Sequence, residues 1–110
     1  MKHWLFLTAA ILCEVIATSS LKASHGFTRP VPTVVVVLGY AAAFYLLSLT
    51  LNALPIGVAY AIWSGVGIVL LAGVGWVAYG QKLDAGAIAG IALIVVGVVI
   101  LNAFSKSVAH

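Results

Sequence analysis

Residues 4–21 of the chain read WLFLTAAILCEVIATSSL, an almost wholly apolar stretch long enough to cross a bilayer as a helix, which takes about 20 residues. Three more apolar stretches follow, at residues 33–51, 57–77 and 86–104. Because backbone polar groups in hydrocarbon must be hydrogen-bonded within the protein, a span is either a helix or a strand of a closed barrel. These stretches lack the polar and apolar alternation of barrel strands. We therefore predict an all-α membrane protein with four transmembrane helices per chain.

The composition supports a membrane protein, since 65% of the residues are hydrophobic and only 6% are charged. The segments between the apolar stretches are too short for a soluble domain, so residues 1–110 are predicted to form a single transmembrane domain. The first stretch could alternatively be a secretory signal, but Glu14 interrupts its apolar run.

The connecting segments carry signals that end and begin helices. Pro30 and Pro32 are predicted to keep the first loop non-helical until the second helix begins. Residues 52–56 form a short uncharged turn, which predicts that the second and third helices are antiparallel neighbours. Asp84 is predicted to cap the N-terminus of the last helix.

The charged residues exclude several classes of function. The five basic residues are scattered over helix ends and loops, so no nucleic-acid partner is predicted: Lys2, Lys22, Arg29, Lys82 and Lys106. The four apolar stretches hold one acid and no His, and the chain has no metal-ligand spacing, so we predict no enzymatic activity, no cofactor and no metal site.

Glu14 is the residue that points to a function. It is the eleventh of the 18 residues in its stretch, about 15 Å deep at about 1.5 Å per residue, too deep to reach either interface. No Lys or Arg lies within any of the four stretches to pair with it. Such a carboxyl group can hold a proton or a cation. The alternative role for Glu14 is structural, as a protonated side chain that forms a hydrogen bond to a neighbouring helix.

The residues around Glu14 on its helix predict a cavity. Ala10, Ala17 and Thr18 lie three or four positions away and are small, which leaves room beside the carboxylate, and Trp4 lies further along the same face. On the third helix, Tyr60, Trp63 and Gly67 share one face. Aromatic walls suit organic cations, and Tyr40 of the second helix could extend the wall.

The glycines of the third and last helices predict a hinge and a surface for helix association. Gly65 and Gly67 weaken the middle of the third helix, where they predict a hinge or, alternatively, close packing against another backbone. Four helices make half of a transporter built from two related halves, so a transporter would need a second copy. The last helix offers small residues for such an interface: Gly86, Gly90 and Gly97, with Leu93 nearby.

Several of these stretches match one known family. The motifs are the segment from Glu14 to Thr18, Lys22, the segment from Gly26 to Arg29, the segment from Pro55 to Gly67, and Gly90 with Gly97. With them the chain resembles the small multidrug resistance transporters, in particular the EmrE-like branch that exports quaternary ammonium compounds.

This resemblance implies a proton-coupled antiporter of the bacterial inner membrane that works by alternating access as an antiparallel homodimer. Glu14 would be shared by protons and small organic cations. Tyr60, Trp63 and Ser64 would belong to the substrate site, with Tyr40 near it, and the glycine face of the last helix would hold the dimer.

The chain also departs from that branch around the predicted cavity. Trp4 stands where the branch usually has Tyr, Ala17 where it often has Gly, and Ala43 where Ser is usual. The guanidinium-exporting branch usually has Trp shortly after its acid and Thr in place of Ser64, so Ile16, Ala17 and Ser64 favour the drug branch. The remaining alternatives are a guanidinium or polyamine exporter, a proton-carrying ring subunit of a rotary ATPase, and a structural membrane subunit.

The charges flanking the four stretches give a weak orienting signal. Lys2 and Lys106 lie on one side of the membrane, and Lys22, Arg29 and Lys82 lie on the other. Because the positive-inside rule depends on this difference, which is a single residue, we predict insertion in both orientations.

Overall fold

The structure is a computed structural model that describes residues 2–106. It contains four helices: α1 (Lys2–Ala23), α2 (Pro30–Thr50), α3 (Ile56–Tyr79) and α4 (Ala85–Phe104). All four are long and apolar enough to cross a membrane. Over residues 2–106 there is no strand, so the predicted all-α architecture with four apolar helices is confirmed.

The helices begin and end close to the predicted positions, with one instructive difference. α2 begins at Pro30 rather than after Pro32. A proline in the first turn of a helix costs nothing, because the N–H that it lacks has no partner there. The predicted cap of α4 is confirmed, since the Asp84 carboxylate accepts a 2.8 Å hydrogen bond from the Ala87 N–H.

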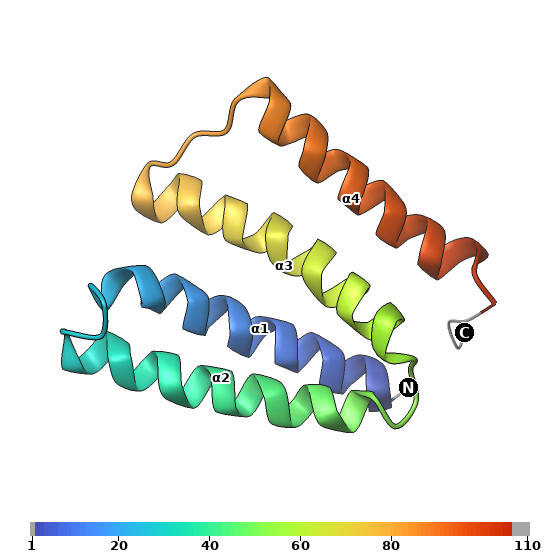
Figure 1. The fold of residues 1–110 in the computed structure, drawn as a ribbon, viewed down its shortest axis with the longest axis horizontal. Coiled ribbons are helices and arrows are strands. Elements are labelled where there is room, and N and C mark those ends of the chain that lie inside the picture. Colours follow the sequence, from blue (N-terminus) through green and yellow to red (C-terminus); the bar gives the residue numbers. More distant parts are fainter. Residues whose placement is uncertain (1, 107–110) are drawn as a thin grey trace.

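The four helices lie side by side in one layer, in the order α2, α1, α3, α4 (Figure 1). The described chain measures 45 × 35 × 17 Å along its principal axes, so this layer is a little more than one helix thick. The core lies mainly between α1 and α3. Its buried apolar side chains are Leu7, Ile11, Val15, Leu54, Val58, Ala59, Ile62 and Trp63.

The prediction that α2 and α3 are close neighbours is largely wrong. α1 lies between them and packs against both, and α2 meets α3 through an edge-to-face contact of Phe44 and Trp63, 5.7 Å between ring centroids. A Cβ added to Gly39 would lie 2.8 Å from the Ala17 Cβ and 3.1 Å from the Cys13 carbonyl oxygen. This close approach of α2 to α1 needs glycine, and it outweighs the shortness of the turn at residues 52–55.

The outer helix α4 packs only against α3 among the described elements, and none of its residues is buried. Its contact with α3 depends on Gly65, because the Val98 side chain occupies the space where a Cβ of residue 65 would lie. The rest of α4 presents an apolar surface, which suits lipid or another membrane helix.

Candidate functional site

The Glu14 carboxylate is bonded through one oxygen only. Its Oε1 accepts a 2.8 Å hydrogen bond from the Thr18 hydroxyl, one turn further along α1. The Thr18 Oγ1 also lies 2.5 Å from the Tyr40 hydroxyl of α2. The Oε2 atom is buried and has no hydrogen-bond partner among the described residues. The carboxylate is therefore fixed at Oε1 and has unused bonding capacity at Oε2.

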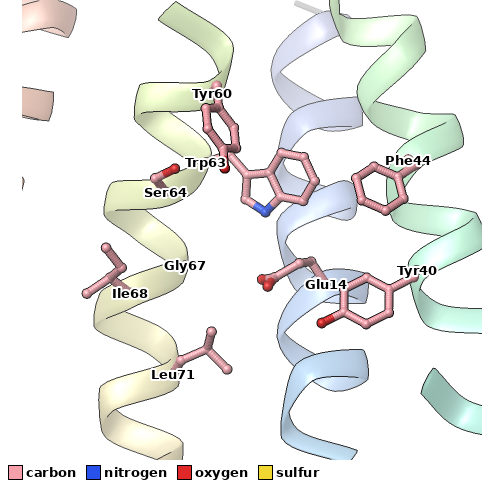
Figure 2. A pocket seen from close by; sticks show the side chains of 9 residues that line it. All are labelled: Glu14, Tyr40, Phe44, Tyr60, Trp63, Ser64, Gly67, Ile68 and Leu71. Atoms are coloured by element: carbon pink, nitrogen blue, oxygen red, sulfur yellow. The ribbon is translucent and has the colours of Figure 1, made fainter. Parts of the chain in front are cut away.

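Figure 2 shows that Glu14 points from α1 toward α3, into a cavity that we call the Glu14 cavity. Its volume is about 270 Å³. A Cβ added to Gly67 would lie 3.5 Å from Glu14 Oε2, so bare backbone of α3 faces the unbonded oxygen. The residues that line the cavity are Glu14, Tyr40, Phe44, Tyr60, Trp63, Ser64, Gly67, Ile68 and Leu71.

Four aromatic side chains form much of the wall. Trp63 makes edge-to-face contacts with Tyr60 at 6.1 Å and with Phe44 at 5.7 Å, and Phe44 stacks on Tyr40 with centroids 6.1 Å apart. These mutual contacts fix the rings in place, and ring faces attract cations.

The electrostatics of the cavity are simple. Glu14 is its one acid, and no Lys, Arg or His is among the residues that line it. An ionised carboxylate in an apolar membrane protein costs several kcal/mol, about 2.5–3.5 by insertion measurements, unless a positive charge pairs with it. The described residues that line the cavity supply no such charge, so the Glu14 carboxylate has no charge partner there.

The structure brings together most of the residues predicted for the site. Tyr40, Tyr60, Trp63 and Ser64 line the Glu14 cavity with Glu14 itself. Thr18 lies behind the acid and bonds to it.

Three other predicted residues do not line this cavity. Ala10 and Ala17 are completely buried, and Ala17 packs against Gly39, so its small size allows α2 to approach. Trp4 lines a separate cavity of about 150 Å³ between α1 and α3. A role of Trp4, Ala10 and Ala17 in substrate binding stays a prediction.

The sequence reasoning missed three lining residues, Phe44, Ile68 and Leu71. Each lies four residues, about one helical turn, after a residue that the sequence already marks as a site candidate or as part of its face. Phe44 follows Tyr40, Ile68 follows Ser64, and Leu71 follows Gly67. Extending the helical spacing by one turn would have found them.

The predicted hinge and dimer face have defined positions in the structure. α3 runs through Gly65 and Gly67 without a break, and Gly65 receives the Val98 side chain. On α4, Gly86, Gly90, Leu93 and Gly97 are exposed. The hinge and the dimer interface stay predictions.

Comparison with known proteins gives one consistent family. The family model described as Small Multidrug Resistance protein matches residues 2–94. The chain is 60% identical to quaternary ammonium compound-resistance protein QacF of Klebsiella aerogenes and 57% identical to QacE of Escherichia coli, in both cases over the full length of both chains. It is 50% identical to the multidrug transporter EmrE of Escherichia coli K12, again over both full chains. The chain therefore belongs to the small multidrug resistance family.

Proposed function

We propose that the protein is a proton-coupled antiporter that exports lipophilic aromatic or quaternary ammonium cations across the bacterial inner membrane. The observation that carries the proposal is the buried, unbonded Oε2 of Glu14 in a cavity without a basic side chain. Relatives in this family are named for resistance to quaternary ammonium compounds and to ethidium bromide.

The cavity offers two kinds of interaction to such a cation. Glu14 supplies one negative charge, and the faces of Trp63, Tyr60 and Phe44 supply cation–π attraction and apolar surface. Neither interaction requires a directed hydrogen bond from the ligand. This combination favours large organic cations with delocalised or shielded charge. It should bind guanidinium more weakly, because the N–H groups of guanidinium need several acceptors.

Proton coupling follows because Glu14 supplies the single negative charge of the cavity. A carboxylate that carries a proton is neutral and attracts a cation weakly, so proton and cation compete for Glu14. Exchange of one for the other on opposite sides of the membrane produces antiport if the cavity opens to each side in turn.

Alternating access needs a second copy of the chain. Transporters usually place the site between two related halves, and the layer of α2, α1, α3 and α4 supplies one of them. An antiparallel second copy would bring two Glu14 residues to the middle of the membrane. The exposed glycine face of α4, with Gly90 and Gly97, is the surface that we assign to this pairing.

The first prediction is that Glu14→Gln abolishes both ethidium binding and the proton release that accompanies it. An amide of the same shape has no charge for a cation and takes no proton. Asp84→Asn is the matched control, because Asp84 is the other acid of the chain and Asn caps a helix equally well. The measurement is ethidium fluorescence together with a pH indicator in weakly buffered detergent. Proton release that persists in Glu14→Gln would refute the shared site.

A further inference from the structure

Beside the Glu14 cavity lies a second cavity of about 200 Å³ between the C-terminal ends of α1 and α3. We call it the polar annex. The residues that matter for it are Thr18, Ser19, Lys22, Leu71, Tyr79 and Gln81. Leu71 lines both cavities, and Thr18 lines the annex while its hydroxyl bonds to Glu14 Oε1. The annex is therefore connected to the carboxylate through Thr18, which bonds to Oε1 and not to the unbonded Oε2.

The annex is lined in part by polar groups. Its polar groups include the Tyr79 hydroxyl, which donates a 2.6 Å hydrogen bond to the Ser19 carbonyl and so joins the ends of α1 and α3. The Ser19 hydroxyl is buried and has no partner among the described residues. Buried polar groups are nearly always satisfied, by water where protein atoms do not reach, and the volume has room for several water molecules.

Lys22 stands at the outer end of the annex. Its side chain is exposed, and its ammonium group lies 5.4 Å from the centre of the Tyr79 ring. A positive charge beside the annex repels organic cations but does not prevent proton transfer along hydrogen-bonded water. The ring that this ammonium covers is also no longer free to attract another cation.

We propose that the two oxygens of Glu14 serve different ligands: Oε2 faces the organic cation in the Glu14 cavity, and Oε1 receives the proton from the polar annex through Thr18. The inference rests on the proposed function and adds a separate proton route to it. In the transfer, a hydronium ion in the annex gives a proton to Thr18 Oγ1 while the Thr18 hydroxyl hydrogen moves to Glu14 Oε1. Water and a neutral carboxyl group remain, and release is the reverse.

The remaining groups around Thr18 fit this role. The Tyr40 hydroxyl, 2.5 Å from Thr18 Oγ1, can donate to it when Glu14 is ionised and accept from it when Glu14 is protonated. The hydrogen bonds that join Tyr40, Thr18 and Glu14 can thus exchange donor and acceptor without moving any heavy atom. From α3, Tyr60 faces the Glu14 cavity and Tyr79 faces the annex, and Lys22 is the one formal charge that lines the annex.

The test compares Thr18→Val with Thr18→Ser in stopped-flow measurements of proton release after mixing with excess ethidium. Valine has the shape of threonine without the hydroxyl, whereas serine keeps the hydroxyl. We expect proton release at least tenfold slower in Thr18→Val and within about threefold of the parent in Thr18→Ser. Ethidium affinity at alkaline pH, where protons no longer compete, is measured in both variants so that any change in binding is separated from the rate of proton release. Release as fast as in the parent from Thr18→Val, or equal loss of ethidium binding in both variants, would overturn the route through Thr18.

A labelling experiment tests the annex itself and does not depend on how Thr18→Val folds. In a Cys13→Ala background, Ser19→Cys should react with water-soluble methanethiosulfonate reagents, and faster with the sulfonate reagent than with the trimethylammonium reagent because of Lys22. Ile16→Cys, on the exposed apolar side of the same helix, is the control and should not react. An unreactive Ser19→Cys, or faster reaction with the cationic reagent, would contradict the proposed annex. A parent protein that releases no proton with ethidium would refute the proposed function instead, and labelling would still decide whether the annex holds water.

Discussion

At the scale of single residues, Glu14 carries a cost that folding does not require. Its Oε2 is buried without a hydrogen bond, an arrangement that costs about 1–3 kcal/mol in a folded protein. Under the proposed function, a bound cation or proton would remove this cost. The free energy recovered in this way would then contribute to binding of either ligand.

The second prediction concerns Trp63, which lines the Glu14 cavity and is also 7% exposed and packed in the core. We expect Trp63→Ala to weaken ethidium binding by about 1–3 kcal/mol through lost burial and cation–π contact. Because alanine also leaves a void in the core, Trp63→Leu is the better variant, since it keeps apolar volume and removes the ring face. Ethidium titration measures the effect.

The control for this prediction is Trp76→Leu, because Trp76 is 54% exposed and lies outside the cavity. It should bind ethidium like the parent. If Trp63→Leu also binds ethidium with unchanged affinity, Trp63 has only a packing role. Proton binding to Glu14 should survive in Trp63→Leu, so cation affinity must fall more than proton affinity does.

The sequence predicted several residues that the structure places together in the Glu14 cavity, but not the contacts that support them. Depth in an apolar stretch identifies Glu14, and helical spacing places Tyr60 and Trp63 on one face. The contact of Thr18 with Tyr40 joins residues 22 positions apart on different helices, and no local pattern contains it. The same limit applies to Ala17, whose size indicated space near Glu14 although Gly39 of α2 fills that space.

At the scale of helices, small residues decide which elements approach each other. Gly39 lets α2 lie against α1, and Gly65 lets α4 lie against α3. In lipid, apolar burial gives little preference between neighbours, so close backbone packing of this kind determines the arrangement.

The third prediction separates packing from hinge motion at Gly65. A methyl group at this position collides with the Val98 side chain, so Gly65→Ala should destabilise the protein by about 1–3 kcal/mol. Gly65→Ala combined with Val98→Ala removes the collision and should restore thermal stability in detergent. Gly73→Ala is the control, because a Cβ there meets nothing within 4 Å.

Transport by the same double variant tests the hinge. If Gly65 serves packing alone, the double variant transports ethidium as the parent does. If helix flexibility at Gly65 is also required, the double variant is stable and inactive, which would support the hinge. An unchanged stability of the single variant Gly65→Ala would contradict the packing account.

Helix limits were predicted closely because apolar length and capping residues are local signals, as Asp84 shows. The sequence did not predict the order of the helices in the layer. The short turn at residues 52–55 suggested contact of α2 with α3. The missing side chain of Gly39 instead allows α2 to pack closely against α1. Which helix packs against a given glycine depends on the side chains of both helices. The sequence of one helix alone does not predict its partner.

In the molecule as a whole, the single layer of helices leaves part of the Glu14 cavity lining exposed. The exposed side chains of the layer are largely apolar, among them Tyr60 at the cavity and Leu93 on α4. In a membrane, lipid or a second copy covers such surfaces. The proposed antiparallel homodimer uses the second copy, and it requires chains inserted in both orientations.

The fourth prediction is that added charge controls activity through orientation. The parent differs by one basic residue between the two sides, two against three, so a C-terminal topology reporter should detect both orientations. His25→Lys with Phe27→Lys, both at exposed loop positions, should force one orientation and depress transport. Co-expression with a variant that carries extra Lys at both termini should restore transport. A parent with a single orientation, or normal transport by the singly biased variant, would exclude the antiparallel dimer.

Uptake into proteoliposomes with an imposed pH gradient tests proton-coupled antiport through Glu14. With the interior acidic, protons leave and cations enter, so the purified parent should concentrate ethidium inside the vesicles and should leave guanidinium near its external concentration. A protonophore should abolish the accumulation, and vesicles with Glu14→Gln should show none. Ethidium accumulation that is independent of the pH gradient, or that persists with Glu14→Gln, would contradict proton-coupled antiport through Glu14.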